Sequence, residues 1–238
     1  SNISLDKKQL NNMIIAGMAT LPERLNTLEL VLDNLHPQVD VIELALNGHA
    51  EIPKLLSKYP KVIPNLTTNE KGDANKFLNV SKYKDDYYFS TDDDILYPSN
   101  YVSTYIKEID KHKSLITIHG SVIPPRKILS YYKGRKMKAH CLNSCEEEIV
   151  HIPGSGVSGF HTSFLKIDYE NGFPNANMAD IFVGIQCQQQ NVKCISIKHA
   201  KEWIKGGLNE GRKTIWETHR HDDRIQTSHI NKITWKNI

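Results

Sequence analysis

Short apolar runs alternate with amphipathic segments along this chain. Apolar runs at residues 13–20 and 39–48 predict two buried strands. Between them, residues 21–35 carry leucines at helical spacing, among them Leu28 and Leu32, which predicts an amphipathic helix. Strands that alternate with helices in this way are typical of an α/β fold.

The rest of the chain continues the alternation. Further strands are expected at 61–69, 86–94, 114–123, 191–199 and in two runs within 148–165. Helices are expected at 51–60, 99–112 and 179–190 and in the polar tail from Trp203, with a loop feeding a helix at 71–84 and a surface excursion at 124–148. Since no repeat or linker interrupts this order, residues 3–238 are predicted to form one domain, with a mixed, mostly parallel sheet flanked by helices.

Composition narrows the choice of partners. The 238 residues include 30 Lys+Arg against 27 Asp+Glu, a formal net charge of +3, which does not suggest a nucleic-acid-binding protein. No apolar run approaches the roughly 20 residues of a membrane span, and no signal peptide is visible. The four cysteines are therefore expected to be reduced thiols in a cytoplasmic protein.

The segment "DDYYFSTDDDILYPSN" runs a predicted strand into Asp92, Asp93 and Asp94. Three adjacent carboxylates repel one another unless a positive group lies among them. A divalent cation bound by oxygen ligands would meet that need at the carboxyl end of a strand. The alternative is a solvated acidic loop or a helix cap.

Other polar groups are expected at the same edge of the sheet. Ligands of open α/β sheets bind beyond the carboxyl ends of the strands. The expected edge residues, besides the aspartates, are Thr20, Arg24, Asn47, Gly154, Ser155, Gly156, His161 and His199. Such a gathering is harder to explain by solvation than the aspartates alone.

These residues resemble a known family. "FSTDDDILYP" is similar to the D-x-D (DXD) motif of GT-A-fold glycosyltransferases, close to the bacterial family 2 enzymes that build capsule and surface polysaccharides. "ATLPERLNTLELVLDNLHPQVDVIELALNG" resembles their opening strand–helix–strand unit, "KGDANKF" their nucleotide-contacting loop, and "GSGVSGFHT" with "NMADIFVGI" their acceptor strand and catalytic acidic motif. The resemblance implies a Rossmann-like GT-A domain with a nucleotide-sugar half at about 12–98 and an acceptor half at about 99–238.

The resemblance also implies a metal site for Mn²⁺ or Mg²⁺. Asp94 is the expected direct ligand, and Asp92 a second ligand or a contact to the ribose or a coordinated water. His199 is the expected imidazole ligand, with His219 and His221 as competitors, and a neutral imidazole suits Mn²⁺ better than Mg²⁺.

The implied donor-binding residues are Thr20, Arg24, Asn47, Asp73, Lys76, Asp92 and Asp93. A cation such as Lys76 near the diphosphate would lower the cost of its growing charge. The alternative is a Gly-Asp turn followed by a solvated lysine. Asp93 should point to the face opposite its neighbours and act as a hydrogen-bonded support.

On the acceptor side, the implied residues are Gly154, Ser155, Gly156 and His161, although His161 fits a core position equally well. Asp180 is the implied base that deprotonates the acceptor hydroxyl, and a single carboxylate opposite the leaving group predicts inversion. The alternative for Asp180 is a helix cap.

Two further motifs leave alternatives open. "HCLNSC" with His151 nearby suggests zinc through His140, Cys141 and Cys145, but the full zinc-finger pattern is missing, so plain thiols in a mobile loop are the alternative. "RKILSYYKGRKMK" is basic and aromatic, and with near-neutral overall charge it suggests a lid over the donor or over an anionic acceptor glycan.

The sequence therefore predicts a metal-dependent, inverting hexosyl- or N-acetylhexosaminyltransferase. It would move a sugar from a UDP-sugar to a glycan or lipid-linked glycan, with peripheral association at the inner face of the cytoplasmic membrane. One alternative is a sugar nucleotidyltransferase, although "GMATLPERL" is a poor match to the glycine-rich loop of such enzymes. The other is a catalytically silent glycan-binding module, which retention of Asp92, Asp94 and Asp180 argues against.

Overall fold

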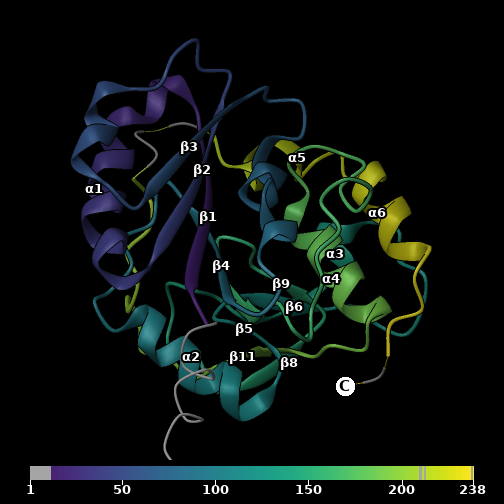
Figure 1. Ribbon diagram of the computed structural model, residues 1–238. Coiled ribbons are helices and arrows are strands. Elements are labelled where there is room, and N and C mark those ends of the chain that lie inside the picture. The colour runs from purple at the N-terminus through teal and green to yellow at the C-terminus, as the bar shows by residue number, and fades with distance from the viewer. Residues whose placement is uncertain (1–11, 209–210, 212, 237) are drawn as a thin grey trace, which may run out of the picture.

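The chain folds around one eight-stranded sheet (Figure 1). The computed structural model describes residues 12–208, 211, 213–236 and 238, so residues 3–11 of the expected domain lie outside the described residues. In sheet order the strands are β3 (Val62–Thr67), β2 (Val41–Asn47), β1 (Ile14–Thr20), β4 (Tyr87–Asp92), β10 (Val157–His161), β5 (Leu115–Thr117), β11 (Cys194–Ser196) and β8 (Glu148–Val150).

The sheet is mixed and mostly parallel, as the sequence predicts. Strands β3, β2, β1 and β4 pair in parallel, and so do β5 and β11. Strand β10 runs antiparallel between β4 and β5, and β8 runs antiparallel to β11 at the edge. A second sheet of three strands contains β7 (Lys136–Ala139), β6 (Gly120–Val122) and β9 (Ile152–Pro153).

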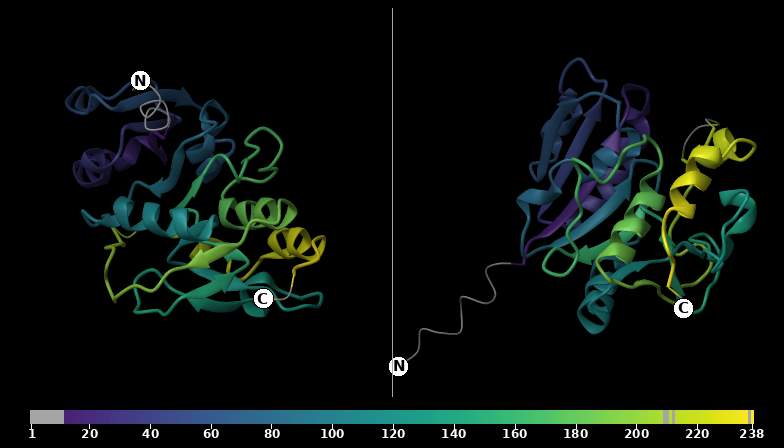
Figure 2. Two further views of the ribbon diagram at one scale, coloured as in Figure 1. Left: turned by 60° about the horizontal axis from the view of Figure 1, so that its bottom comes forward. Right: turned by 90° about the vertical axis from the view of Figure 1, so that its right-hand side faces the viewer.

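Helices cover both faces of the large sheet (Figures 1 and 2). They are α1 (Leu25–Leu35), α2 (Tyr101–His112), α3 (Tyr131–Gly134), α4 (Ala179–Gln189), α5 (Ile215–His219) and α6 (Arg224–Asn231). The segments expected as a short helix at 51–60 and as a loop feeding a helix at 71–84 form 3-10 turns, Lys54–Lys58, Gly72–Phe77 and Val80–Lys82. Among the described residues, no helix has the length and apolar character needed to cross a membrane.

Alternating residues of the central strands pack into two separate hydrophobic cores, one on each face of the large sheet. Ile15 and Tyr88 pack on the face covered by α4, whereas Ala16 and Phe89 pack on the face covered by α1 and α2. Successive side chains of a strand point to opposite faces, so a buried strand needs apolar residues at both. This explains why the first and fourth strands read as continuous apolar runs.

The prediction of one continuous strand at 114–123 is wrong. It forms β5 in the large sheet and β6 in the small sheet, and the chain turns at His119. The hydroxyl of Thr117 donates to the carbonyl of His119 at 3.1 Å and accepts from its N–H at 3.3 Å. A side chain that bonds its own backbone in this way competes with the strand ladder, which ends β5 here.

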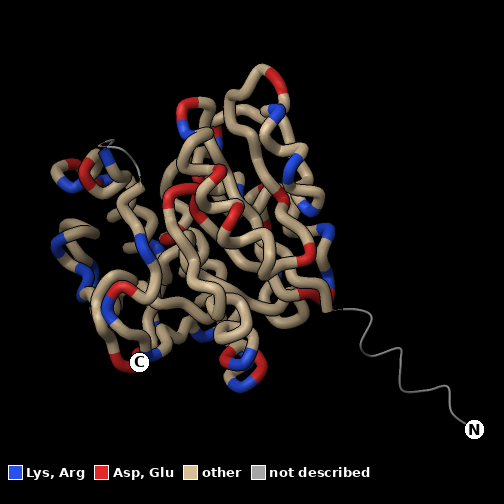
Figure 3. Tube along the Cα trace, turned by 90° about the vertical axis from the view of Figure 1, so that its left-hand side faces the viewer, with Lys and Arg blue, Asp and Glu red and all other residues tan. Residues whose placement is uncertain are grey.

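Charged residues do not segregate into one basic face. Lys and Arg are interspersed with Asp and Glu along the trace (Figure 3). This distribution agrees with the small net charge of +3.

Two leucines of α1 offer a matched test of this packing. Leu32 is 0% exposed and Leu30 is 51% exposed. We expect Leu32→Ala to lower the free energy of unfolding by about 2–5 kcal/mol, because it removes buried methyl groups and leaves a cavity. Leu30→Ala should change it by less than about 0.5 kcal/mol. Urea unfolding of both variants measures the difference, and equal losses would contradict this placement of α1.

Candidate active site

A pocket of about 760 Å³ opens beyond the carboxyl ends of β1, β2 and β4. Its wall contains most of the residues singled out from the sequence. They are Thr20, Arg24, Asn47, Asp73, Lys76, Asp92, Asp93, Asp94, Ser155 and Asp180. The strand ends therefore bring together groups that lie as much as 160 positions apart in the chain (180 − 20 = 160).

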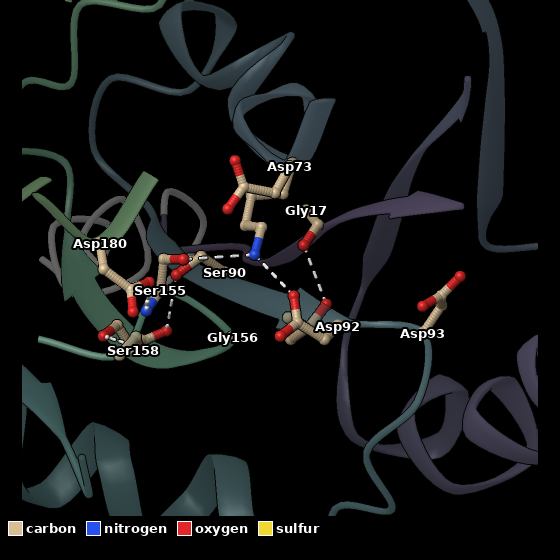
Figure 4. Close-up of polar contacts among 12 residues, drawn as sticks. Gly17, Asp73, Ser90, Asp92, Asp93, Ser155, Gly156, Ser158 and Asp180 are labelled. Atoms are coloured by element: carbon tan, nitrogen blue, oxygen red, sulfur yellow. Dashed lines mark hydrogen bonds and ion pairs between the residues drawn. The ribbon is translucent and has the colours of Figure 1, made fainter. Parts of the chain in front are cut away.

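Asp93 is held away from its two neighbours. It accepts hydrogen bonds from the Thr20 hydroxyl at 2.8 Å and from the Arg24 guanidinium at 2.9 Å. Burial raises the pKa of Asp93, while Arg24 opposes that rise. Figure 4 shows Asp93 pointing away from Asp92 and from the rest of the drawn cluster. This geometry is that of a hydrogen-bonded support between β1 and the aspartate loop.

Asp92 forms an ion pair with Lys76 at 2.6 Å (Figure 4). Its backbone N–H donates to the Tyr97 hydroxyl at 2.8 Å, and that hydroxyl donates to the carbonyl of Gly156 at 2.5 Å. A Cβ added at Gly156 would lie 1.9 Å from Oδ2 of Asp92, so a larger residue would displace the Asp92 carboxylate from this position. The glycine-rich segment therefore serves as packing surface for the first aspartate.

Lys76 is buried, with 3% of its side chain exposed. This contradicts the alternative of a solvated lysine after a turn. Its ammonium also donates to the Ser155 hydroxyl at 3.3 Å. Burial lowers the pKa of Lys76, but Asp92 and Asp73 outweigh burial and raise it, so the side chain is a permanent cation.

Asp73 lies beside this cation. Its Oδ1 is buried and has no hydrogen-bond partner among residues 12–208, 211, 213–236 and 238. Burial raises the pKa of Asp73 to about 7, with Lys76 opposing and the charges of Asp180 and Asp92 adding to the rise. The 3-10 turn that carries Asp73 begins at Gly72, whose φ is +56°. A carboxyl that changes protonation near neutral pH thus borders the pocket.

Among the three adjacent aspartates, Asp94 differs in the contacts of its carboxylate. Within the described part of the chain it forms no hydrogen bond or ion pair, and it is half-buried on the pocket wall. Burial raises its pKa to about 6, and Asp92 and Asp93 add to this rise. An open carboxylate next to another carboxylate offers the oxygen ligands that a hard divalent cation prefers. The residues present therefore fit Mn²⁺ or Mg²⁺.

Asp180 does not cap its helix. It is the second residue of α4, the helix begins after Met178, and no side chain caps it. Instead, Oδ1 of Asp180 accepts from the backbone N–H of Ser155 at 2.8 Å (Figure 4). Asp180 therefore makes no capping hydrogen bond, although it lies in the first turn of α4, where a negative charge favours the helix dipole. Its carboxylate contacts the glycine-rich segment at Ser155.

Asn47 is hydrogen-bonded to the loop that carries Asp73. Its amide donates to the carbonyl of Gly72 at 3.0 Å and to Asn69 at 3.1 Å, and its oxygen accepts from Asn75 at 2.9 Å. These bonds tie the end of β2 to the turn that carries Asp73. Asn47 lines the pocket and also fixes the shape of its wall.

Two predicted histidines lie elsewhere. His161 ends β10 opposite Tyr87, at the end of the sheet away from the aspartates, and it contacts Asn12 and Ser163. The two ring nitrogens of His199 face backbone carbonyl oxygens of Ile197 and His140, at 2.8 and 3.2 Å. The structure does not bring either ring to the pocket.

Of the competing histidines, His219 from α5 lines the pocket, whereas His221 is exposed and does not. Gly154 precedes the pocket residue Ser155 and is buried. Of the three histidines predicted as candidate metal ligands, His219 is therefore the one that lines the pocket.

The structure does not bring the predicted zinc ligands His140, Cys141, Cys145 and His151 together as one site. His151 is turned inward, where its Nδ1 accepts from Ile123 N–H at 2.9 Å and its Nε2 lies 2.7 Å from the carbonyl of Lys236. Cys145 contacts only the backbone of His140 through its sulfur. Ligand atoms of His140 and Cys141 instead lie within 4.8 Å of each other and of a ligand atom of His119.

The far wall of the pocket comes from segments whose role sequence reasoning left open. Tyr131, Tyr132 and Arg135 line it, together with Trp216 of α5. The Arg135 guanidinium lies over both tyrosine rings, at 4.8 and 5.0 Å from their centres. The basic and aromatic composition of this run was the signal, and the fold places it against the pocket.

Comparisons with known proteins define the fold. No family model and no curated protein matches the chain. Among solved structures, S. aureus TarS 1–349 is similar, with a TM-score of 0.52 and 12% identity over 79% of this chain and 58% of that chain. The complex of TarS 1–349 with UDP has a TM-score of 0.53 and 12% identity, over 79% of this chain and 59% of that chain. The complex with UDP-GlcNAc has a TM-score of 0.54 and 11% identity, over 94% of this chain and 68% of that chain.

This chain has a GT-A-like glycosyltransferase fold. It spans 58% of the first of these TarS chains, so the match covers part of that protein. At such low identity the likeness concerns the fold alone. Membership of family 2 and a role in capsule synthesis stay predictions.

The pKa of Asp73 predicts a pH-dependent stability. Its folded value is about 7 against an ordinary value of 3.8, so its stabilising contribution is present at low pH and is lost as pH rises through about 7. Between about pH 5 and pH 8, we expect the wild type to lose about 1–3 kcal/mol more unfolding free energy than Asp73→Asn. Urea unfolding at both pH values measures this.

The control is Asp85→Asn, at a side chain that is 63% exposed. It should follow the wild type at both pH values. Parallel pH profiles for the wild type and Asp73→Asn would contradict the expected titration of Asp73.

Proposed function

We propose that the GT-A-like chain is a metal-dependent, inverting glycosyltransferase that moves a sugar from a UDP-sugar to a glycan or lipid-linked glycan. The observation that carries this proposal is the shared pocket of Asp94, Lys76 and Asp180. TarS structures in complex with UDP and with UDP-GlcNAc support the choice of donor. A lipid-linked acceptor would bring the protein to the inner face of the cytoplasmic membrane.

Asp94 and Asp92 would hold the metal ion, with His219 of the same pocket as the candidate imidazole. When bound, a divalent cation stabilises negative charge on the phosphates of the leaving group. The role of Asp93 is different, because its carboxylate is already committed to Thr20 and Arg24. It keeps the loop in the shape that presents its two neighbours.

Lys76 and Arg24 would act on the diphosphate. Lys76 is fixed by Asp92 and Ser155, so its ammonium needs no reorganisation when charge develops nearby. Arg24 uses Nη1 on Asp93, and its side chain is 26% exposed and lines the pocket. A guanidinium carries five N–H donors, so one that lines the pocket suits a phosphate oxygen.

Asp180 would take the proton of the acceptor hydroxyl. Its Oδ1 is held by the N–H of Ser155, which orients the carboxylate and leaves Oδ2 for the acceptor. Ser155 also contacts Lys76, so one residue sets the base and the diphosphate cation relative to each other. A single carboxylate base predicts displacement with inversion at the anomeric carbon.

The metal site gives the first functional prediction. UDP should bind with Mn²⁺ present and at least about tenfold more weakly with chelator, because a divalent cation held by Asp94 and Asp92 would stabilise the negative charge of the phosphates. Asp94→Ala should abolish that difference. Isothermal titration calorimetry measures it, with Asp85→Ala, at the opposite end of β4, as the control that keeps metal dependence. Equal UDP affinity with and without metal in the wild type would refute the metal site.

The proposed base, Asp180, gives the second functional prediction. Asp180→Asn retains an oxygen that can accept from Ser155 N–H, so the fold and UDP affinity should persist. Loss of a positioned base should lower sugar transfer about 10²–10⁴-fold. The measurement is the rate of transfer to an accepted glycan, beside UDP affinity and thermal stability. Near-normal transfer by Asp180→Asn would move the base elsewhere, and no transfer by the wild type with any donor would favour a silent module.

A further inference from the structure

His119 is fixed on the pocket wall beside Asp180. Its carbonyl accepts from the N–H of Gly154 at 2.8 Å, while the next N–H, that of Ser155, binds Asp180. A Cβ added at Gly154 would lie 2.9 Å from Cβ of His119, so the glycine permits the close approach. Two consecutive peptide groups thus hold His119 and Asp180 relative to each other.

The ring of His119 has a defined proton position. The backbone N–H of Cys141 donates to Nδ1 at 3.2 Å, so Nδ1 supplies a lone pair and the proton of the neutral ring lies on Nε2. Burial lowers the pKa of His119 to about 4, with Asp180 opposing and His140 adding to the fall. The ring is therefore neutral at pH 7 and offers an N–H donor through Nε2.

The same geometry argues against zinc at this cluster. Ligand atoms of His119, His140 and Cys141 lie within 4.8 Å of one another. However, Nδ1 of His140 also accepts a backbone N–H, that of Leu142, at 3.3 Å. A histidine that binds metal through Nε2 carries its proton on Nδ1 and donates it to an acceptor. Here a backbone N–H donor faces Nδ1 of both His119 and His140, so neither Nδ1 can donate in this way. Burial also raises the pKa of the Cys141 thiol to about 11, which disfavours the thiolate that zinc requires.

We propose that His119 is a sugar-binding residue, whose Nε2–H donates to a hydroxyl oxygen of the sugar carried by the nucleotide. This rests on the proposed function. A sugar hydroxyl is both donor and acceptor, so a wall that offers a neutral N–H next to a carboxylate matches it. A neutral donor also suits a hydroxyl better than a phosphate, for which Arg24 and Lys76 are available on the same pocket.

The test compares UDP with UDP-GlcNAc, each with Mn²⁺, by calorimetry. His119→Phe keeps a planar ring without the donor, and it should weaken UDP-GlcNAc about three- to tenfold while leaving UDP unchanged. His119→Gln places an amide N–H near the position of Nε2 and should recover affinity to within about twofold of wild type. The matched control is His221→Phe, at an exposed residue that does not line the pocket, and it should change neither affinity.

Several results would overturn the proposal. Equal losses for UDP and UDP-GlcNAc, or no loss, would remove His119 from the sugar site while leaving the proposed function intact. Zinc retained by the purified wild type and lost in His119→Gln would make the residue a metal ligand instead. If the wild type binds neither nucleotide, the proposed function fails and this proposal fails with it.

A measurement on the wild type covers the case in which His119→Phe does not fold. Nitrogen-15 NMR of the histidine rings should show His119 neutral and protonated at Nε2, with a shift when UDP-GlcNAc is added but not with UDP. A ring protonated at Nδ1, or one that responds equally to both nucleotides, would refute the proposal.

Discussion

The buried ammonium of Lys76 is the constraint around which the pocket is arranged. A charge that is removed from water costs several kcal/mol unless an opposite charge and further hydrogen bonds compensate it. Asp92, Asp73 and the Ser155 hydroxyl supply that compensation. They come from β4, from the turn after β3 and from the segment before β10, so these three pieces must meet at one point.

The same constraint makes the carboxylates of the pocket unequal. Asp92 is neutralised by Lys76, and Asp93 by Arg24, whereas Asp94 keeps an open carboxylate. Asp180 is held by one backbone N–H, and Asp73 remains close to its point of protonation near pH 7. Carboxylates in such different surroundings can perform different tasks, from binding a cation to accepting a proton.

Glycines and backbone amides of the segment before β10 complete the arrangement around Asp180. Gly156 leaves room for Asp92, and Gly154 leaves room for His119. The N–H groups of Gly154 and Ser155 then bind His119 and Asp180. A short segment without bulky side chains thereby sets the distance between Asp92 and Asp180, and its two glycines leave room for the side chains packed against it.

The sequence by itself determined the class of fold and the location of the site. Apolar runs that alternate with amphipathic ones specify strands and helices, and polar groups after parallel strands must meet at one edge, so Thr20, Asn47 and Asp92–Asp94 could be placed together in advance. Tertiary structure alone decided strand direction. Because β10 runs antiparallel to β4, its start lies at the pocket and His161 lies at the far end. Nor could local pattern show that Nε2 of His199 faces the carbonyl of His140, or that β6 pairs with β7 and β9 instead of continuing β5, because these contacts join residues distant in sequence.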